Sequence, residues 1–463
     1  MKKLNRLNRY TLTFYNNQCR IIMDDTPGGL KRQRNERRNK MKRYFAVLSI
    51  IGLFLSCTQL TSIESTPPYH SIVTGKSDSE QDVKAVQEAV DKGGTVLLKG
   101  TFDFGPKGRV NIKNDVAVWG ESDSNGRPLT KIYGGFWVFH SPLPSTDLPL
   151  PGPGPKITIK NIHFDGVTWS PMHFPYTSGA EIYGNKITNV QPFNLPIKWK
   201  GGDFVLVQTG IILGTRFAHK EKFLPGAVTG KLVVENNEID LKCENPKITM
   251  GHGVFIPWTW GATIEVKGNT IRNVSRNSIE SLDNYLDGDG RGSVTITGND
   301  IVTPADGCPF PGAVTYPSGI VVGWFFDRSG GADPTKNSKI TIASNSIQAN
   351  GELSTGISSM SDGTHILENR IELNGGPKAK GITQSGSNGK ISKNKIKGTG
   401  AWAVAAISWE AFKGSGNVFE WNDMSEFKAS SADFYCTGNK NTFTGPECSV
   451  IDKGEDNKIL VRS

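Results

Sequence analysis

The chain has 463 residues, of which 53 are glycine and 36% are hydrophobic, a composition that favours many short strands and turns over long helices. Its formal net charge of +9 is concentrated in residues 1–40, which contain eleven basic and three acidic residues. The chain after residue 60 is close to neutral, which excludes the basic footprint of a nucleic-acid-binding domain.

Residues 41–57 have the pattern of an export signal. Lys42 and Arg43 precede an apolar run over residues 44–56 that ends at Cys57. The run is shorter than the roughly 20 residues that a membrane-spanning helix needs. Cys57 resembles the lipidated cysteine of bacterial lipoproteins, so we expect a cell-surface or outer-membrane lipoprotein whose membrane contact is its N-terminal lipid. Ordinary signal-peptidase cleavage, giving a periplasmic or secreted protein, is the alternative.

The signal divides the chain into four parts. Residues 1–40 are interpreted as an upstream extension that the mature protein lacks, and residues 58–77 as a linker. Residues 78–463 are expected to form a single, monomeric domain.

That domain is predicted to begin with a short amphipathic helix. Ser79 and Asp82 are spaced as a capping box, and Gly93-Gly94 should end the helix. A strand over residues 95–98 and a Gly-aromatic turn, Gly100–Phe102, follow. The valines expected on the buried helical face are Val83, Val86 and Val90.

An asparagine flanked by apolar residues then recurs along the chain. Asn345, Asn369 and Asn394 follow one another at intervals of 24 and 25 residues, a period that is typical of a solenoid. We expect each asparagine at a turn, in the left-handed backbone conformation, with its amide bonded to the asparagine of the next coil. The other members are Asn185, Asn237, Asn269, Asn299 and Asn422.

A second repeated pair, a small residue followed by an apolar one, lies between the asparagine turns. Examples are Gly253-Val254, Ser278-Ile279 and Gly356-Ile357, and they predict two strands and a turn per coil. With the preceding helix and Gly-aromatic turn, this repeat resembles the pectin lyase-like superfamily. The resemblance implies an all-β fold, a single-stranded right-handed parallel β-helix with an N-terminal capping helix, over residues 78–463.

The resemblance does not extend to a subfamily. Gly251-His252-Gly253 is similar to the Gly-His-Gly element of polygalacturonases, but their Asn-Thr-Asp, paired Asp and Arg-Ile-Lys elements are absent from the sequence. The Arg-x-Pro-x-x-Arg element of pectate lyases is absent too. Fold alone does not specify a reaction.

Candidate catalytic residues lie where long insertions enlarge the coils. Because Ile279 should point inward, Glu280 should point outward, where Asp283 or Asp327 would supply the second carboxylate of a glycosidase and His252 a base. The residues expected to bind a polysaccharide there are Phe255, Trp258, Trp260, Trp324 and Arg328.

These residues leave several functions open. The leading hypothesis is a protein that binds polysaccharide and cleaves it, as a lyase or a hydrolase. The same acids can be ordinary solvated charges and the tryptophans can pack loops, which would leave a non-catalytic adhesin or glycan-binding protein. A purely structural envelope protein is the third possibility.

The cysteines and one acidic turn offer a candidate disulfide and a candidate calcium site. Four cysteines follow the signal, and Cys436 and Cys448 are predicted to form a disulfide near the last coils. Asp287-Gly-Asp289 offers oxygen atoms that calcium could use, but it lacks the rest of an EF-hand loop and is interpreted as a turn. We therefore expect no metal or other cofactor.

Overall fold

The computed structural model describes residues 69–145, 149–196, 205–214, 224–242, 250–305, 317–323, 339–408 and 412–462, together with an isolated hairpin near the N-terminus. The hairpin pairs β1 (Thr13–Tyr15) with β2 (Gln18–Arg20). Residues 1–66 and 67–463 form two separate units. Of the residues assigned to sites from the sequence, Cys57, Trp324, Asp327 and Arg328 lie outside the described residues.

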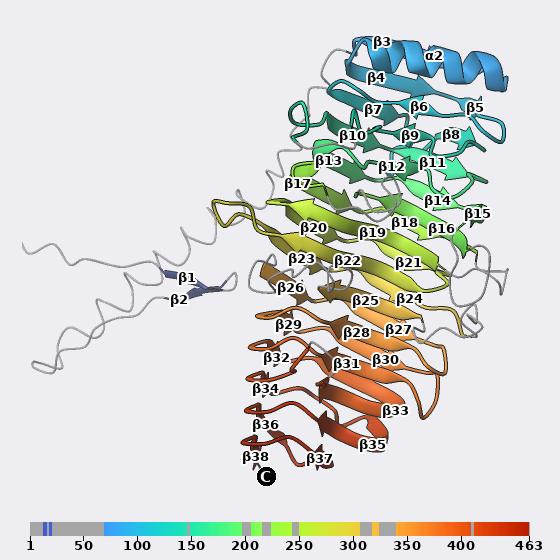
Figure 1. Ribbon diagram of the computed structural model, residues 1–463. Coiled ribbons are helices and arrows are strands. Elements are labelled where there is room, and N and C mark those ends of the chain that lie inside the picture. Colours follow the sequence, from blue (N-terminus) through green and yellow to red (C-terminus); the bar gives the residue numbers. More distant parts are fainter. Residues whose placement is uncertain are drawn as a thin grey trace, which may run out of the picture. The chain divides into compact units, whose positions relative to one another are not determined.

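The second unit is built from strands that repeat coil by coil, from α2 and β3 at one end to β37 and β38 at the other (Figure 1). A first sheet has 14 parallel strands. They are β3 (Ser71–Thr74), β4 (Gly94–Lys99), β7 (Val116–Gly120), β10 (Lys156–Lys160), β13 (Thr177–Tyr183), β17 (Val228–Glu235), β20 (Thr263–Lys267), β23 (Ser293–Thr297), β26 (Lys339–Ala343), β29 (His365–Leu367), β32 (Lys390–Ser392), β34 (Val418–Glu420), β36 (Thr442–Pro446) and β38 (Lys458–Arg462).

A second sheet of 22 strands contains two columns that meet in the long strand β33 (Lys395–Ala406). The first column holds β5 (Thr101–Asp103), β8 (Thr130–Tyr133), β11 (Ile162–Asp165), β14 (Lys186–Thr188), β18 (Glu238–Asp240), β21 (Thr270–Arg272), β24 (Asp300–Val302), β27 (Ser346–Ala349) and β30 (Arg370–Leu373). The second column holds β6 (Val110–Asn111), β9 (Phe139–His140), β12 (Met172–His173), β16 (Val205–Ile212), β19 (Met250–Trp260), β22 (Asn277–Tyr285), β25 (Ser318–Gly323), β28 (Thr355–Ser359), β31 (Lys380–Gln384), β35 (Phe427–Cys436) and β37 (Val450–Asp452).

Parallel pairing of each strand with its equivalent in the next coil confirms the expected parallel β-helix. A full coil has three strands, one more than the sequence repeat predicts: β26, β27 and β28 precede β29, which pairs with β26 again. An exception to parallel pairing is β15 (Phe193–Leu195), which pairs antiparallel with β16.

Alternating residues of these strands fill a continuous apolar core. In β26, for example, Ile340 and Ile342 are buried while the residues between and beside them are not, as expected for a strand with one covered face. The same cluster runs from Val86 in the helix to Phe443 near the last coil.

The expected asparagine ladder is confirmed. From Asn185 to Asn394, each Nδ2 donates to Oδ1 of the next coil's asparagine over 2.9–3.0 Å. The side chains from Asn185 to Asn422 in this ladder are at most 2% exposed. The left-handed conformation, however, belongs to the residue before each asparagine. The residues with positive φ are Gly184, Asn236, Gly268, Gly298, Ser344, Glu368, Lys393 and Trp421.

The helix at the start of the solenoid, α2 (Ser79–Asp91), is confirmed with a different cap. Oδ1 of Asp78 accepts the backbone N–H of Gln81, so Asp78 rather than Ser79 is the N-cap. Asp82 is 1% exposed and accepts the backbone N–H groups of Lys76 and Asp78, just before the helix, and of Asp103 in β5. It therefore joins the helix to the first coil. Part of the expected linker is also folded, since β3 (Ser71–Thr74) is the first strand of the first sheet.

The predicted disulfide is not formed, because Cys436 and Cys448 are both free. Cys436 lies opposite Asp452, four residues beyond Cys448. Four extended residues span roughly 13 Å, whereas bridged cysteines need Cα atoms within about 7 Å of each other. Burial raises the pKa of the Cys436 thiol to about 11, so this thiol is protonated and unreactive at neutral pH.

Candidate functional site

His252 and Glu280 come together because β19 and β22 pair in register, with Phe255 opposite Glu280. In β19, two successive residues, Gly253 and Val254, face the core. A Cβ added to Gly253 would lie 2.7 Å from Cγ2 of Ile271, so a larger side chain has no room there. The residues on either side of this pair therefore face outward.

Glu280 contacts two polar side chains. Its Oε2 lies 2.9 Å from Nε2 of His252 and accepts a hydrogen bond from Nδ2 of Asn277. Burial raises the pKa of Glu280, but the charges of His252 and Arg276 and the two side-chain contacts outweigh it and lower the pKa to about 2. Glu280 is therefore an anion at neutral pH.

The sequence placed Glu280 on the correct side of its strand but wrongly predicted that it is exposed. Both Glu280 and His252 are 1% exposed. Glu280 lies between Phe255 on one neighbouring strand and Val321 on the other, and each belongs to a separate apolar cluster outside the solenoid core. The buried residues of the Phe255 cluster are Trp169, Val207, Ile212 and Phe255. Those of the cluster against which Val321 packs are Leu282, Met360 and Phe412.

Two of the aromatic residues expected to bind a ligand are also buried. Phe255 is fully buried and stacks on His252, with ring centroids 4.5 Å apart and planes 14° apart. Trp258 is 3% exposed. Neither offers an open ring face to a sugar in this structure, because both pack within the protein.

Asp283 lies three residues after Glu280 on β22 and is fully buried, so its carboxylate is not exposed to a ligand, contrary to the prediction. Asp283 and Trp258 occupy equivalent places in successive coils, and both have positive φ values of 54°. This backbone is strained for residues other than glycine, and it is fixed on each side by regular pairing of the strands.

Trp260 is the last residue of β19, eight residues after His252. It borders a hollow of about 660 Å³, whose wall contains Asp289 and Arg291. Its ring centroid is 6.5 Å from that of Tyr285. The remaining lining residues are Thr229, Gly230, Gly261, Thr263, Asp287 and Gly288. We call this hollow the Trp260 pocket.

The loop on the far side of the Trp260 pocket is organised by Asp287. Its Oδ1 accepts the backbone N–H groups of Asp289 and Arg291, over 3.0 and 2.8 Å, and its Oδ2 lies 2.7 Å from Nε of Arg291. These contacts support its interpretation as a turn residue, and hydrogen bonding to Arg291 lowers the pKa of Asp287. The side chains of Asp289 and Arg291 stay largely exposed.

Sequence reasoning missed a second group of aromatic and basic residues in the first coils. The ring centroid of Trp137 lies 5.0 Å from that of His140 and 4.1 Å from that of His173. The guanidinium carbon of Arg109 lies 4.8 Å from the Trp137 ring centroid. The coils here lack the asparagine repeat that aligns the later ones, so the sequence could not place these residues side by side.

Neither a metal centre nor a membrane-spanning helix is found within the described ranges. These residues contain no group of three or more His, Cys, Asp or Glu side chains placed to hold a metal ion. No described helix has both the length and the apolar character needed to cross a membrane.

No protein-family model and no curated protein sequence matches the chain. Among solved structures, the chain is similar to PfbA, a surface adhesin of Streptococcus pneumoniae, with 13% identity, a TM-score of 0.43 and coverage of 83% of this chain and 91% of PfbA. It is similar to the GH136 lacto-N-biosidase from Eubacterium ramulus, with 11% identity, a TM-score of 0.44 and coverage of 85% and 68%. It is also similar to a mannuronic acid specific polysaccharide family 6 lyase from human gut microbiota, with 11% identity, a TM-score of 0.40 and coverage of 84% of this chain and 82% of the lyase. Likeness at this level carries no inference about activity.

Proposed function

We propose that the chain is an exported protein that binds polysaccharide, with the Trp260 pocket as its contact site. The observation that supports this most is an open hollow of about 660 Å³ in which an indole ring stands beside a guanidinium and a carboxylate. Aromatic rings pack against the apolar faces of sugars, and charged groups give directional hydrogen bonds to hydroxyls. Thr229 and Thr263 add hydroxyl groups to the same wall.

Screening the purified protein against acidic and neutral polysaccharides tests this proposal. We expect the protein to bind at least one of these polysaccharides. Soluble fragments of that polysaccharide should compete for the binding. Failure of every polysaccharide class to bind would contradict it.

Cleavage of the bound polysaccharide is a second candidate function, supported by the pairing of Glu280 with His252 at 2.9 Å. A carboxylate beside an imidazole can orient the ring and stabilise its protonated form, which suits acid–base catalysis. The 1% exposure of both side chains favours binding without cleavage, since a scissile bond has no path to them in this conformation.

Glu280→Gln separates the two candidates because it keeps the shape of the side chain and removes its charge. If the native protein cleaves a bound polysaccharide at this pair, the variant should lose at least about 100-fold in rate and still bind the polymer. New chain ends, measured over time for both proteins, report the rate. An unchanged rate would show that cleavage occurs elsewhere.

Export is proposed from the pattern of residues 41–57, and lipidation from Cys57. We expect the mature chain to begin at Cys57, with residues 1–40 absent, because the basic pair, apolar run and cysteine fit signal cleavage. Mass spectrometry of the N-terminal peptide from the native host measures this. An intact N-terminus that carries residues 1–40 would contradict it, and an unmodified later start would indicate ordinary signal-peptidase cleavage.

A further inference from the structure

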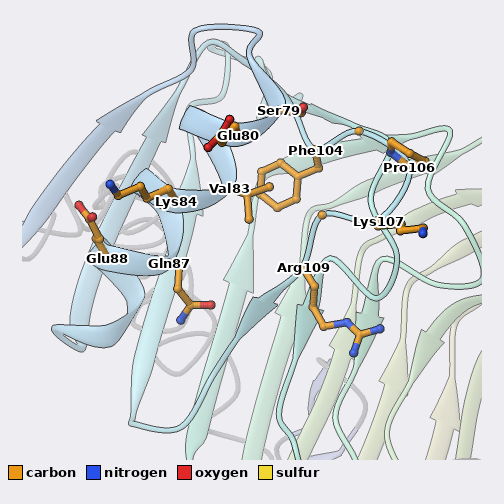
Figure 2. Close-up of a pocket in the computed structure, with 12 residues that line it drawn as sticks. Ser79, Glu80, Val83, Lys84, Gln87, Glu88, Phe104, Pro106, Lys107 and Arg109 are labelled. Atoms are coloured by element: carbon orange, nitrogen blue, oxygen red, sulfur yellow. The ribbon is translucent and has the colours of Figure 1, made fainter.

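A hollow of about 490 Å³ lies at the capped end of the solenoid, between α2 and the turn that joins β5 to β6. Val83 of the helix and Phe104 of the turn are among the residues that line it (Figure 2). Gly108 lets the turn approach the helix, because a Cβ there would lie 2.8 Å from Cγ2 of Val83. With Pro106, these residues give the hollow an apolar wall. We call it the cap pocket.

Arg109 borders the cap pocket, and its guanidinium is fixed in one orientation. Nε donates to the carbonyl oxygen of Phe136 over 3.2 Å. The guanidinium carbon lies 5.1 Å from the ring centroid of Phe136 and 4.8 Å from that of Trp137, so the cation is held against two aromatic rings. A guanidinium has five N–H donors, and Nε is the one that bonds within the described chain.

No described carboxylate forms an ion pair with Arg109, although Arg272 and Arg291 pair with Asp300 and Asp287. The side chain of Arg109 is half-buried, and burial lowers its pKa, but a guanidinium stays protonated at neutral pH. A half-buried cation with unused donors is a charge that an anion would compensate.

The surrounding charges also favour an anion. The side chains lining the cap pocket include the cations Lys84, Lys107 and Arg109 and the anions Glu80 and Glu88, which leaves one positive charge in excess. Beyond the pocket, His140 stacks on Trp137 and adds no charge at neutral pH, because burial and the charge of Arg109 lower its pKa to about 4.

We propose that the cap pocket binds a small organic anion, with an apolar or aromatic body against Val83 and Pro106 and a carboxylate on Arg109. The planar guanidinium can donate two parallel N–H groups to the carboxylate oxygens, an arrangement that an ammonium cannot match. The site is formed by residues 79–109, several coils before those around Trp260, and does not depend on polysaccharide binding.

Calorimetric titration of the purified protein with 2-naphthoate tests the proposal, with 2-naphthylmethylamine as the cation of similar shape. We expect naphthoate to bind and the amine to bind at least tenfold more weakly. Arg109→Gln should weaken naphthoate binding at least tenfold, and Arg109→Lys, which keeps the charge, should weaken it less. Arg291→Gln, which removes the same charge from the Trp260 pocket, should leave it unchanged.

Three results would overturn the proposal: no naphthoate binding at millimolar concentration, equal binding of the amine, or equal binding by the native protein and Arg109→Gln. Circular dichroism establishes that each variant is folded. If Arg109→Gln does not fold, Arg109→Lys and Val83→Glu decide the matter, since a carboxylate placed on the apolar wall should repel naphthoate and weaken its binding at least tenfold.

Discussion

Glu280→Ala is expected to lower the free energy of unfolding at pH 7 by about 3–5 kcal/mol, the usual cost of removing one partner from a buried ion pair. The carboxylate lies 2.9 Å from His252 and between the apolar residues Phe255 and Val321. Removing it leaves His252 and the 8% exposed Arg276 without the anion that compensates them. Urea unfolding of the native and variant proteins measures the difference.

The same carboxylate should make stability depend on pH below neutrality. Its pKa is about 2 in the folded protein, below the ordinary value of 4.5, so the folded state favours the ionised form. The resulting stabilisation is present above pH 4.5 and is lost as the pH falls towards 2, and it amounts to about 3 kcal/mol. Glu280→Gln should lack this part of the acid dependence.

Glu238→Ala is the matched control, because it removes a carboxylate that pairs with Lys186 over 2.7 Å at the surface. The side chain of Glu238 is 53% exposed, and exposed pairs contribute at most about 1 kcal/mol. Equal effects of Glu280→Ala and Glu238→Ala would contradict the description of Glu280 as a buried, compensated anion.

Asn369→Ala is expected to destabilise the solenoid by a similar amount, about 3–5 kcal/mol. The fully buried amide of Asn369 donates to the carbonyl of Ile342 over 3.0 Å and to Oδ1 of Asn394 over 2.9 Å. Its Oδ1 accepts the backbone N–H and the side-chain amide of Asn345 over 3.0 and 2.9 Å. Alanine replaces none of these bonds, and each buried group left unsatisfied costs about 1–3 kcal/mol.

Asn374→Ala, in the same coil, makes the same substitution at the surface. Asn374 is exposed and donates a single side-chain hydrogen bond to Asn350, so we expect a change within about 0.5 kcal/mol. Thermal or urea unfolding compares the two variants. A cost below about 1 kcal/mol for Asn369→Ala would show that the ladder contributes little to stability.

The sequence predicts the fold well because a solenoid repeats its local interactions. The interval between Asn345 and Asn369 gives the coil length, and the ladder bonds of these residues follow from it. The position of the left-handed residue was predicted one place too late, at the asparagine instead of at residues such as Ser344 and Glu368. The repeat identifies the corner of the coil but not which residue there takes the unusual backbone angle.

The candidate site was less predictable, because side-chain burial outside the solenoid core does not follow from the repeat. Register alone places Phe255 opposite Glu280 and both on the outer side of the sheet. What covers them depends on residues such as Trp169 and Leu282, which join clusters outside the periodic core. Arg109 and Trp137 were missed for a related reason, since their contact joins coils that have no asparagine to align them.

We propose that polysaccharide contacts the Trp260 pocket, and equilibrium binding by Trp260→Ala tests this most directly. With a polysaccharide that the native protein retains, we expect Trp260→Ala to weaken binding at least about tenfold, or about 1.4 kcal/mol. Trp421→Ala, which removes a 51% exposed indole from a distant corner, should bind as the native protein does. If Trp260→Ala is folded and binds as tightly as Trp421→Ala, the ligand does not lie in the Trp260 pocket.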